Sequence, residues 1–267
     1  MFGVWSATQD WGGRLTSVSV PAHLGVDKRS SSEPLLQAQG LVREYGTVTA
    51  VDGIDLSLAR GEFLTIFGPN GAGKTSLLAL LAGALRPNCG QVWLRGETLD
   101  FGEVEWRHRI GVLSHQGFLY GHLSAEENLR FYGQLFGLSD LDDVVNHKLQ
   151  HLGLQDRAGS LVRDLSHGMK QRLALARALL HDPDIVLLDE PYTGLDPSAA
   201  IVLQGVLSDL KDGQRTIVMV THNLTEGLAL ATTAAIMNRG RFVWQGKRAE
   251  IEGDFGQFYY GVIEGEE

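Results

Sequence analysis

Apolar and polar residues alternate between residues 37 and 62, with turn residues between the alternating stretches. This pattern is typical of antiparallel strands that bury one face. FLTIF at 63–67 is a short, continuous apolar run, which also favours a strand. DIVLLDE at 184–190 and RTIVMVTHN at 215–223 predict strands of the buried, parallel kind. We expect one further strand in QVWLRGETL at 91–99.

Helical spacing dominates other parts of the chain. SLLALLAGAL at 76–85 predicts a helix that Pro87 closes, and a helix-length segment at 197–211 separates the two parallel strands. Between about residues 117 and 180 the pattern is mainly helical, and Ser124 has capping-box spacing there. The predicted helices of this insertion are 124–137, 140–153 and 169–180. We therefore expect an α/β core with a β-rich start and a helical insertion.

Residues 1–33 differ from the rest because their apolar residues are scattered without a period. They lack the compact apolar core of a secretion signal. We predict a flexible tail over 1–33, the alternative being a mis-assigned start codon, and one domain over 34–267.

Composition and charge narrow the function classes. Apolar residues make up 43% of the chain and charged residues 21%, which indicates a globular protein. The net charge of −9, without a long basic run, argues against a nucleic-acid partner. Cys89 is the only cysteine, so an internal disulfide is excluded and a reducing compartment is favoured. The longest apolar stretch, around Leu77–Leu85, falls short of the ~18 residues that cross a bilayer.

GPNGAGKTS at 68–76 carries the strongest chemical signal, because it fits G-x-x-x-x-G-K-[ST] between a strand and a helix. Its glycines let backbone N–H groups point at phosphate oxygens. Lys74 is expected at the β and γ phosphates, Thr75 at Mg²⁺ and Ser76 at the α phosphate. The alternative is a glycine-rich turn without a ligand. The candidate nucleotide-binding residues of this loop are Gly68, Pro69, Asn70, Gly71, Ala72, Gly73, Lys74, Thr75 and Ser76.

Two acidic residues follow the predicted strand at 184–190. Asp189 is a candidate Mg²⁺ ligand, because a carboxylate at the carboxyl end of a parallel strand lies beside a phosphate loop. Glu190 is expected to point elsewhere and to polarise the water that attacks the γ phosphate. Pro191 then removes a backbone donor and fixes the turn. The pair is a weak signal alone, and the phosphate loop strengthens it.

LSHGMKQR at 165–172 runs directly into a helical pattern. Ser166 and the N–H groups around Gly168 would form a helix start, where about half a positive charge is available to an anion. The simpler interpretation is an N-cap alone, worth ~1 kcal/mol.

Residues 35–250 resemble the ATP-binding-cassette (ABC) ATPases in the order and spacing of their motifs. The motifs are GPNGAGKT, LSHQG, LSHGMKQR, IVLLDE, GLD and VTHN. The resemblance implies an α/β P-loop NTPase with a RecA-like core, an antiparallel β subdomain and a helical signature-motif subdomain at about 117–180. It also implies ATP hydrolysis, with ATP and Mg²⁺ bound.

The same resemblance assigns further residues. Tyr45 matches the aromatic that stacks on adenine, the alternative being a core aromatic. Gln116 matches a residue that touches Mg²⁺ and the attacking water, and His222 matches the histidine that contacts the γ phosphate. Asp196 matches the loop that crosses the dimer interface beside the nucleotide. The expected catalytic residues are thus Glu190, His222 and Gln116, and the expected Mg²⁺ ligands are Thr75, Gln116 and Asp189.

Two such ATPases face each other head to tail, so Ser166 and Gly168 are expected to cover the ATP held by a second copy. The usual signature sequence of the family is Leu-Ser-Gly-Gly-Gln. Here His167 replaces the first glycine and Met169 the glutamine. Because Gly168 is retained, we expect the ATP-bound pair to form.

The chain has one cassette and no long coiled coil between Lys74 and Ser166, which leaves transporter subunits and a soluble iron–sulfur assembly ATPase. In transporter cassettes the surface after the Mg²⁺-contacting glutamine receives a short helix of the integral-membrane permease, so the resemblance implies that Phe118, Leu119 and Tyr120 are apolar anchors there. SHQGFLYGHLSAEENLRFY is similar to haem-exporter ATPases of cytochrome c maturation. We expect a peripheral location on the cytoplasmic face of the inner membrane. The alternative to a haem exporter is the ATPase of an ABC-2-type exporter of drugs, lipids or polysaccharide.

Overall fold

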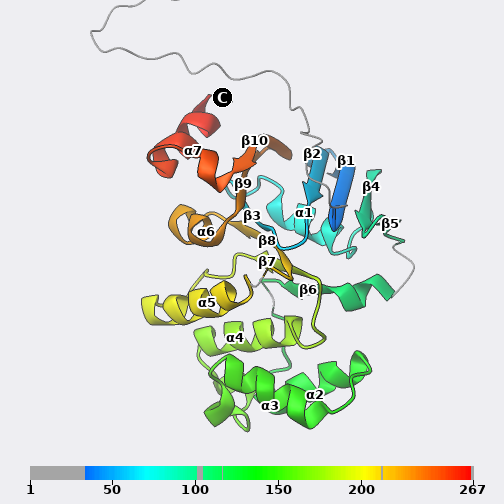
Figure 1. Ribbon diagram of the computed structural model, residues 1–267, viewed down its shortest axis with the longest axis vertical. Helices are drawn as coiled ribbons and strands as arrows, with labels where there is room; N and C mark the ends of the chain where they lie inside the picture. Colours follow the sequence, from blue (N-terminus) through cyan, green and yellow to red (C-terminus); the bar gives the residue numbers. More distant parts are fainter. Residues whose placement is uncertain (1–33, 101–104, 116, 212, 266–267) are drawn as a thin grey trace, which may run out of the picture. The chain divides into compact units, whose positions relative to one another are not determined.

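The computed structural model describes residues 34–100, 105–115, 117–211 and 213–265, and within them the strands form two sheets (Figure 1). The smaller sheet is antiparallel, with the order β2 (Val48–Leu58), β1 (Leu36–Tyr45), β4 (Cys89–Leu94) and β5 (Glu97–Thr98). The larger sheet has the order β10 (Arg241–Lys247), β9 (Thr233–Asn238), β3 (Phe63–Phe67), β8 (Thr216–Thr221), β7 (Ile185–Asp189) and β6 (Ile110–Leu113). The strands from β9 to β6 pair in parallel, and β10 pairs antiparallel with β9.

Helices cover the larger sheet and extend beyond it (Figure 1). The helices are α1 (Lys74–Leu81), α2 (Ala125–Leu135), α3 (Leu141–His151), α4 (His167–Ala178), α5 (Pro197–Asp209), α6 (Leu224–Leu230) and α7 (Phe255–Glu264). Short 3₁₀ turns are η1 (Glu105–Arg109), η2 (Gln155–Arg157), η3 (Val162–Asp164) and η4 (Arg248–Glu250). The helices expected between residues 117 and 180 are present as α2, α3 and α4. In the described parts of the chain, no helix is both long and apolar enough to span a bilayer.

The central strands are buried on both faces, as predicted. Every residue of β3, β7 and β8 is buried. Alternate residues enter different cores, because successive side chains of a strand point to opposite faces. Leu187 and Val218 pack with α1 and the antiparallel sheet, whereas Leu188 and Met219 pack with residues of α2 to α5. The larger sheet is therefore the middle layer, between two hydrophobic cores.

One expectation about strands needs correction. QVWLRGETL is not one strand, because a two-residue turn at Arg95 and Gly96 divides it into β4 and β5. Both turn residues have positive φ, 52° and 78°, as tight hairpin turns require. Strands β6, β9 and β10 were not predicted. The capping box at Ser124 is confirmed, since its hydroxyl accepts from Glu127 N at 3.1 Å and its N–H donates back to the Glu127 carboxylate at 2.7 Å.

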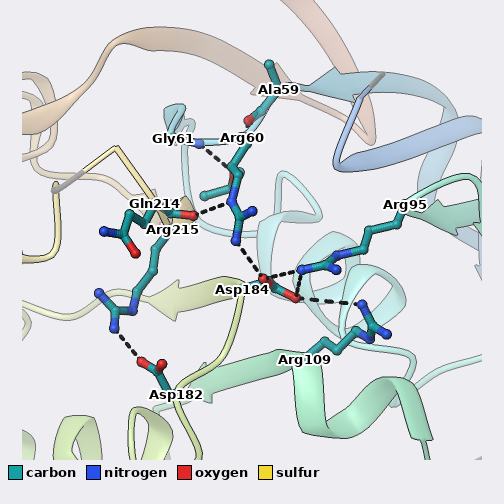
Figure 2. Close-up of polar contacts among 10 residues, drawn as sticks. Ala59, Arg60, Gly61, Arg95, Arg109, Asp182, Asp184, Gln214 and Arg215 are labelled. Atoms are coloured by element: carbon teal, nitrogen blue, oxygen red, sulfur yellow. Dashed lines mark hydrogen bonds and ion pairs between the residues drawn. The ribbon is translucent and has the colours of Figure 1, made fainter. Parts of the chain in front are cut away.

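A cluster of arginines around Asp184 joins the two sheets (Figure 2). Asp184 precedes β7, and its carboxylate accepts from Arg95 Nη2 at 2.6 Å and Arg60 Nη2 at 3.1 Å. Arg109 Nη1 lies 3.9 Å from the same carboxylate. Arg95 belongs to the β4–β5 turn, so the antiparallel sheet is fastened to the amino end of β7. The predicted Mg²⁺ ligand Asp189 lies at the other end of this strand.

Candidate functional site

Three neighbouring parallel strands end at one edge of the larger sheet. β3 leads into the phosphate loop at Gly68, β7 ends at Asp189, and β8 ends at Thr221. The register places Phe67 opposite Thr221 and Asp189 opposite Val220. Since side chains beyond the carboxyl ends of adjacent parallel strands converge, this edge is where an α/β fold binds ligands.

The phosphate loop needs its glycines for two different reasons. Gly71 and Gly73 have φ values of 83° and 102°, which residues with a Cβ rarely adopt. A Cβ at Gly73 would lie 1.9 Å from the Ala50 carbonyl oxygen, and one at Gly68 would lie 2.2 Å from that of Met237. A Cβ at Gly71 would meet open space, so a glycine is required there only because of the positive φ. The glycine spacing read from the sequence thus corresponds to real steric limits.

Lys74 is buried inside this loop, with 7% of its surface exposed. Its Nζ donates to the carbonyl oxygens of Gly68 at 2.8 Å and Pro69 at 3.1 Å, and lies 3.8 Å from Glu190 Oε1. Burial lowers the pKa of Lys74, while the nearby carboxylates of Glu190 and Asp189 oppose that shift. A desolvated cation in a ring of backbone groups is suited to phosphate oxygens.

Asp189 and Thr75 form an oxygen-rich pair beside the loop. Asp189 is 6% exposed, and Thr75 Oγ1 donates to its Oδ1 at 3.2 Å. Desolvation raises the pKa of Asp189, and the Thr75 hydrogen bond opposes this. A hydroxyl and one carboxylate fit Mg²⁺, which prefers few protein ligands beside phosphate and water. No group of three or more His, Cys, Asp or Glu with metal-binding spacing occurs in the described residues. Gln116, the other expected ligand, lies outside them.

Glu190 turns away from Asp189, as the sequence predicted. Its Oε2 accepts from Thr221 Oγ1 at 3.1 Å and lies 2.9 Å from His222 Nδ1. Its backbone has φ of 48°, an uncommon value for a residue with a side chain, and its N–H donates to Val220 O at 3.0 Å. Thr221 was missed by the sequence reasoning, although its position at the end of β8 was a usable signal.

Tyr45 lines the same cleft and is not a core residue. Its side chain is 45% exposed, and the Arg43 guanidinium lies 4.8 Å from the centre of its ring. The alternative of a buried strand aromatic is therefore wrong. The cleft has a volume of about 300 Å³, at the lower end for small-molecule sites. Its lining residues are Tyr45, Ala50, Asn70, Gly71, Ala72, Gly73, Lys74, Thr75, Ser76 and Glu190.

The serine and glycine of LSHGMKQR occupy a different place. Ser166 caps α4, its hydroxyl accepting from Met169 N at 3.3 Å. Gly168 packs against α5, where an added Cβ would lie 2.8 Å from Ala199 Cβ. The predicted helix start is confirmed. Contact of these residues with a nucleotide stays a prediction.

Asp196 caps α5 in the same manner. Its carboxylate accepts from Ser198 Oγ at 2.6 Å and Ala199 N at 2.9 Å, and these bonds lower its pKa. Ser166, Gly168 and Asp196 are absent from the described lining of the Lys74 cleft. Within one copy, the structure thus gathers the phosphate loop, Tyr45, the acid pair and His222, and leaves these three residues at two helix starts.

Known proteins resemble most of this chain. Residues 51–193 match the model of the ABC transporter family. Nod factor export ATP-binding protein I of Ralstonia nicotianae is 37% identical over 222 residues, 82% of this chain and 69% of that protein. Spermidine/putrescine import ATP-binding protein PotA of Pseudomonas aeruginosa is 39% identical over 211 residues, 78% of this chain and 58% of that protein.

The solved structure of cbiO1 from Clostridium perfringens, described as part of the ABC transporter complex cbiONQ, has the same fold. It aligns with a TM-score of 0.75 and 26% identity, over 86% of this chain and 93% of that one. The expected fold, a P-loop NTPase with an antiparallel sheet and a helical subdomain, is confirmed. With the phosphate loop, the acid pair and the signature helix all inside the matched region, the chain belongs to the ABC transporter family as an ATP-binding subunit that hydrolyses ATP.

Proposed function

We propose that two copies of this chain bind MgATP between them, head to tail, and hydrolyse it to drive an exporter. The observation that carries the proposal is the separation of two sets of groups within one copy. Lys74 and Glu190 line one cleft, whereas Ser166 lies outside it at the start of α4. A helix start with a hydroxyl cap attracts anions, so the phosphates held by a second copy are its proposed partner.

In this proposal each copy binds its own nucleotide through groups that already point into the cleft. Tyr45 stacks on the adenine, and the loop N–H groups with Lys74 hold the phosphates. Thr75 and Asp189 hold Mg²⁺ together with Gln116. When bound, the ion neutralises charge on the β and γ phosphate oxygens.

Glu190 and His222 are the proposed catalytic pair. The Glu190 carboxylate orients the attacking water and accepts its proton as the water oxygen bonds to the γ phosphorus. The bond from that phosphorus to the ADP oxygen breaks in line. His222 Nδ1 lies 2.9 Å from Glu190 Oε2. The other ring nitrogen, Nε2, is the proposed donor to the γ phosphate, in the imidazolium form of the ring.

A membrane permease is the proposed partner of an apolar groove beside the helical region. The groove has a volume of about 580 Å³, combines apolar side chains with the half-buried Arg177, and also reaches Thr75 and Asp189 of the nucleotide site. Phe118, one of its lining residues, is 51% exposed and Tyr120 is 41% exposed, whereas Leu119 is partly buried against a core cluster. Two of the three expected anchors therefore remain for a partner. The expected location on the cytoplasmic face of the inner membrane follows from that partner.

The cargo class rests on the resemblances alone. The Nod factor relative supports export, whereas the spermidine/putrescine relative is named for import. Neither is named for haem export, so the comparisons do not support that finer expectation. We keep export as the proposal, with an ABC-2-type cargo ahead of haem. Cytochrome c maturation genes beside this gene would reverse that order.

Two experiments test the function. Glu190→Gln should form dimers in MgATP by size exclusion with light scattering, while Lys74→Ala in the same background should stay monomeric. Affinity capture from detergent-solubilised membranes should recover a multi-span permease. Recovery of a soluble scaffold instead would favour an iron–sulfur assembly ATPase. Monomeric Glu190→Gln at saturating ATP would contradict the head-to-tail pair.

A further inference from the structure

His167 makes a contact that a glycine at this position would lack. It is the first residue of α4, directly after the cap Ser166. Its Nε2 lies 3.1 Å from the carbonyl oxygen of Thr193. Its ring also packs over the neighbouring peptide, because a Cβ at Gly194 would lie 3.1 Å from the same nitrogen. The ring is thus directed at a segment of its own chain.

That segment is the turn that follows the proposed catalytic carboxylate. Thr193 N donates to the Glu190 carbonyl oxygen at 3.1 Å, so a single residue, Thr193, links Glu190 to His167 through its N–H and its carbonyl oxygen. Gln171, one helical turn further along α4, donates from Nε2 to the Pro191 carbonyl oxygen at 2.9 Å. His167 and Gln171 are four residues apart and share one helix face. Two side chains of α4 therefore hold two carbonyls of one turn.

The turn needs such support because its first residue is strained. Glu190 has φ of 48°. A residue with a Cβ holds this conformation only when its surroundings impose it. The Glu190 side chain is fixed by Thr221 and His222, but its backbone orientation also depends on the turn that follows. Loss of a tie at Thr193 would let this turn relax and move the carboxylate.

We propose that His167 is a positioning residue that couples the two ATP sites of the pair. Through Thr193 it ties the turn carrying Glu190, which serves the chain's own ATP, to the helix start carrying Ser166, which covers the ATP of the second copy. This proposal rests on the head-to-tail arrangement proposed above. The tie itself is a contact within one copy and is measurable there.

The bond requires a proton on Nε2. The Thr193 carbonyl oxygen can only accept, so His167 must be the donor in this contact. The variants should therefore change the N–H donor at this position separately from the aromatic ring.

Four variants separate the donor from the ring. His167→Phe keeps an aromatic ring without a donor, His167→Gly removes the side chain, and His167→Gln restores an N–H donor. His147→Phe, at an exposed histidine of α3, is the matched control. Each variant is measured for ATPase kcat, KM and Hill coefficient, and for amide hydrogen exchange over residues 190–196.

The expected results follow from one lost hydrogen bond. In His167→Phe and His167→Gly, kcat falls about three- to tenfold, KM stays near the wild-type value, and the Hill coefficient falls toward 1. Exchange over 190–196 becomes faster even without ATP. His167→Gln and His147→Phe behave as wild type.

Different failures have different meanings. Unchanged kcat and unchanged exchange in His167→Phe would overturn the inference, as would an equal loss in His167→Gln. If Glu190→Gln fails to dimerise with ATP, the proposed function fails and the coupling fails with it. If it dimerises while His167→Phe keeps the wild-type Hill coefficient, only the coupling between sites is overturned.

Discussion

His222 Nδ1 lies 2.9 Å from Glu190 Oε2, so a partly exposed imidazole and a mostly buried carboxylate orient each other at the ends of β8 and β7. Thr221 Oγ1 donates to the same carboxylate oxygen at 3.1 Å. Glu190→Gln keeps the shape but removes the proton acceptor. We expect kcat to fall by about 10²- to 10⁴-fold with ATP affinity retained. Single-turnover hydrolysis with radiolabelled ATP measures this, and wild-type hydrolysis in the variant would remove Glu190 from the role.

Lys74→Ala should abolish the thermal stabilisation by nucleotide. At an ATP concentration 100 times Kd, binding stabilises the wild-type chain by about 2.7 kcal/mol. For a chain of this size that corresponds to a rise in Tm of roughly 5–10 °C. Removal of the buried cation takes away its charge from the phosphates, so the variant should show no shift. Thermal melts with and without MgATP check this, with Lys211→Ala as an exposed control. A wild-type shift in Lys74→Ala would contradict the assignment of the phosphate loop.

Tyr45→Ala should weaken ATP binding without changing the chemical step. Base–aromatic stacking is worth about 1–3 kcal/mol, so Kd should rise about 5- to 150-fold. Tyr45→Trp keeps a stacking face and should bind nearly as the wild type does. Fluorescence titration with a labelled ATP analogue measures the constants. Equal affinities in wild type and Tyr45→Ala would show that the exposed ring does not meet the base.

His181 should make the fold sensitive to mild acid. Its ring stacks on Phe136 with centroids 4.0 Å apart, its Nε2 lies 3.3 Å from the Ile110 carbonyl oxygen, and burial lowers its pKa to about 4. The unfolded chain binds this proton near pH 6.5 and the folded chain only near pH 4, so the free energy of unfolding falls as pH drops through this window.

The size of this acid sensitivity is at most about 3 kcal/mol. Urea unfolding at pH 7, 6 and 5 should show a shallower pH dependence in His181→Gln than in the wild type. His147→Gln, at an exposed position of α3, should keep the wild-type dependence. The same slope in His181→Gln and wild type would show that another group titrates.

Local patterns predicted most of the site because its chemistry depends on strand ends and glycine positions. The continuous apolar runs identified β3, β7 and β8, and parallel pairing then brings their carboxyl ends together. Position 73 requires a glycine because the Ala50 carbonyl oxygen leaves no room for a Cβ. Asp189 ends β7, and Glu190 follows it with a positive φ of 48°, so the two side chains have different partners, Thr75 and His222.

Other features could not be read from local patterns because they depend on segments far apart in the chain. The Arg95–Asp184 contact spans 89 residues and needs both sheets in place. The His167–Thr193 contact needs α4 to lie against the turn after β7. The β4–β5 turn was missed because Arg95 gives little sequence signal for positive φ. Gln116 and the tail at 1–33 lie outside the described residues, so those expectations stay predictions.

The head-to-tail pair is tested most directly by the crystal structure of Glu190→Gln with MgATP. We predict that Ser166 Oγ of one copy lies within hydrogen-bond distance, about 3 Å, of a γ phosphate oxygen held by Lys74 of the other. A structure in which Ser166 lies remote from every triphosphate would contradict it.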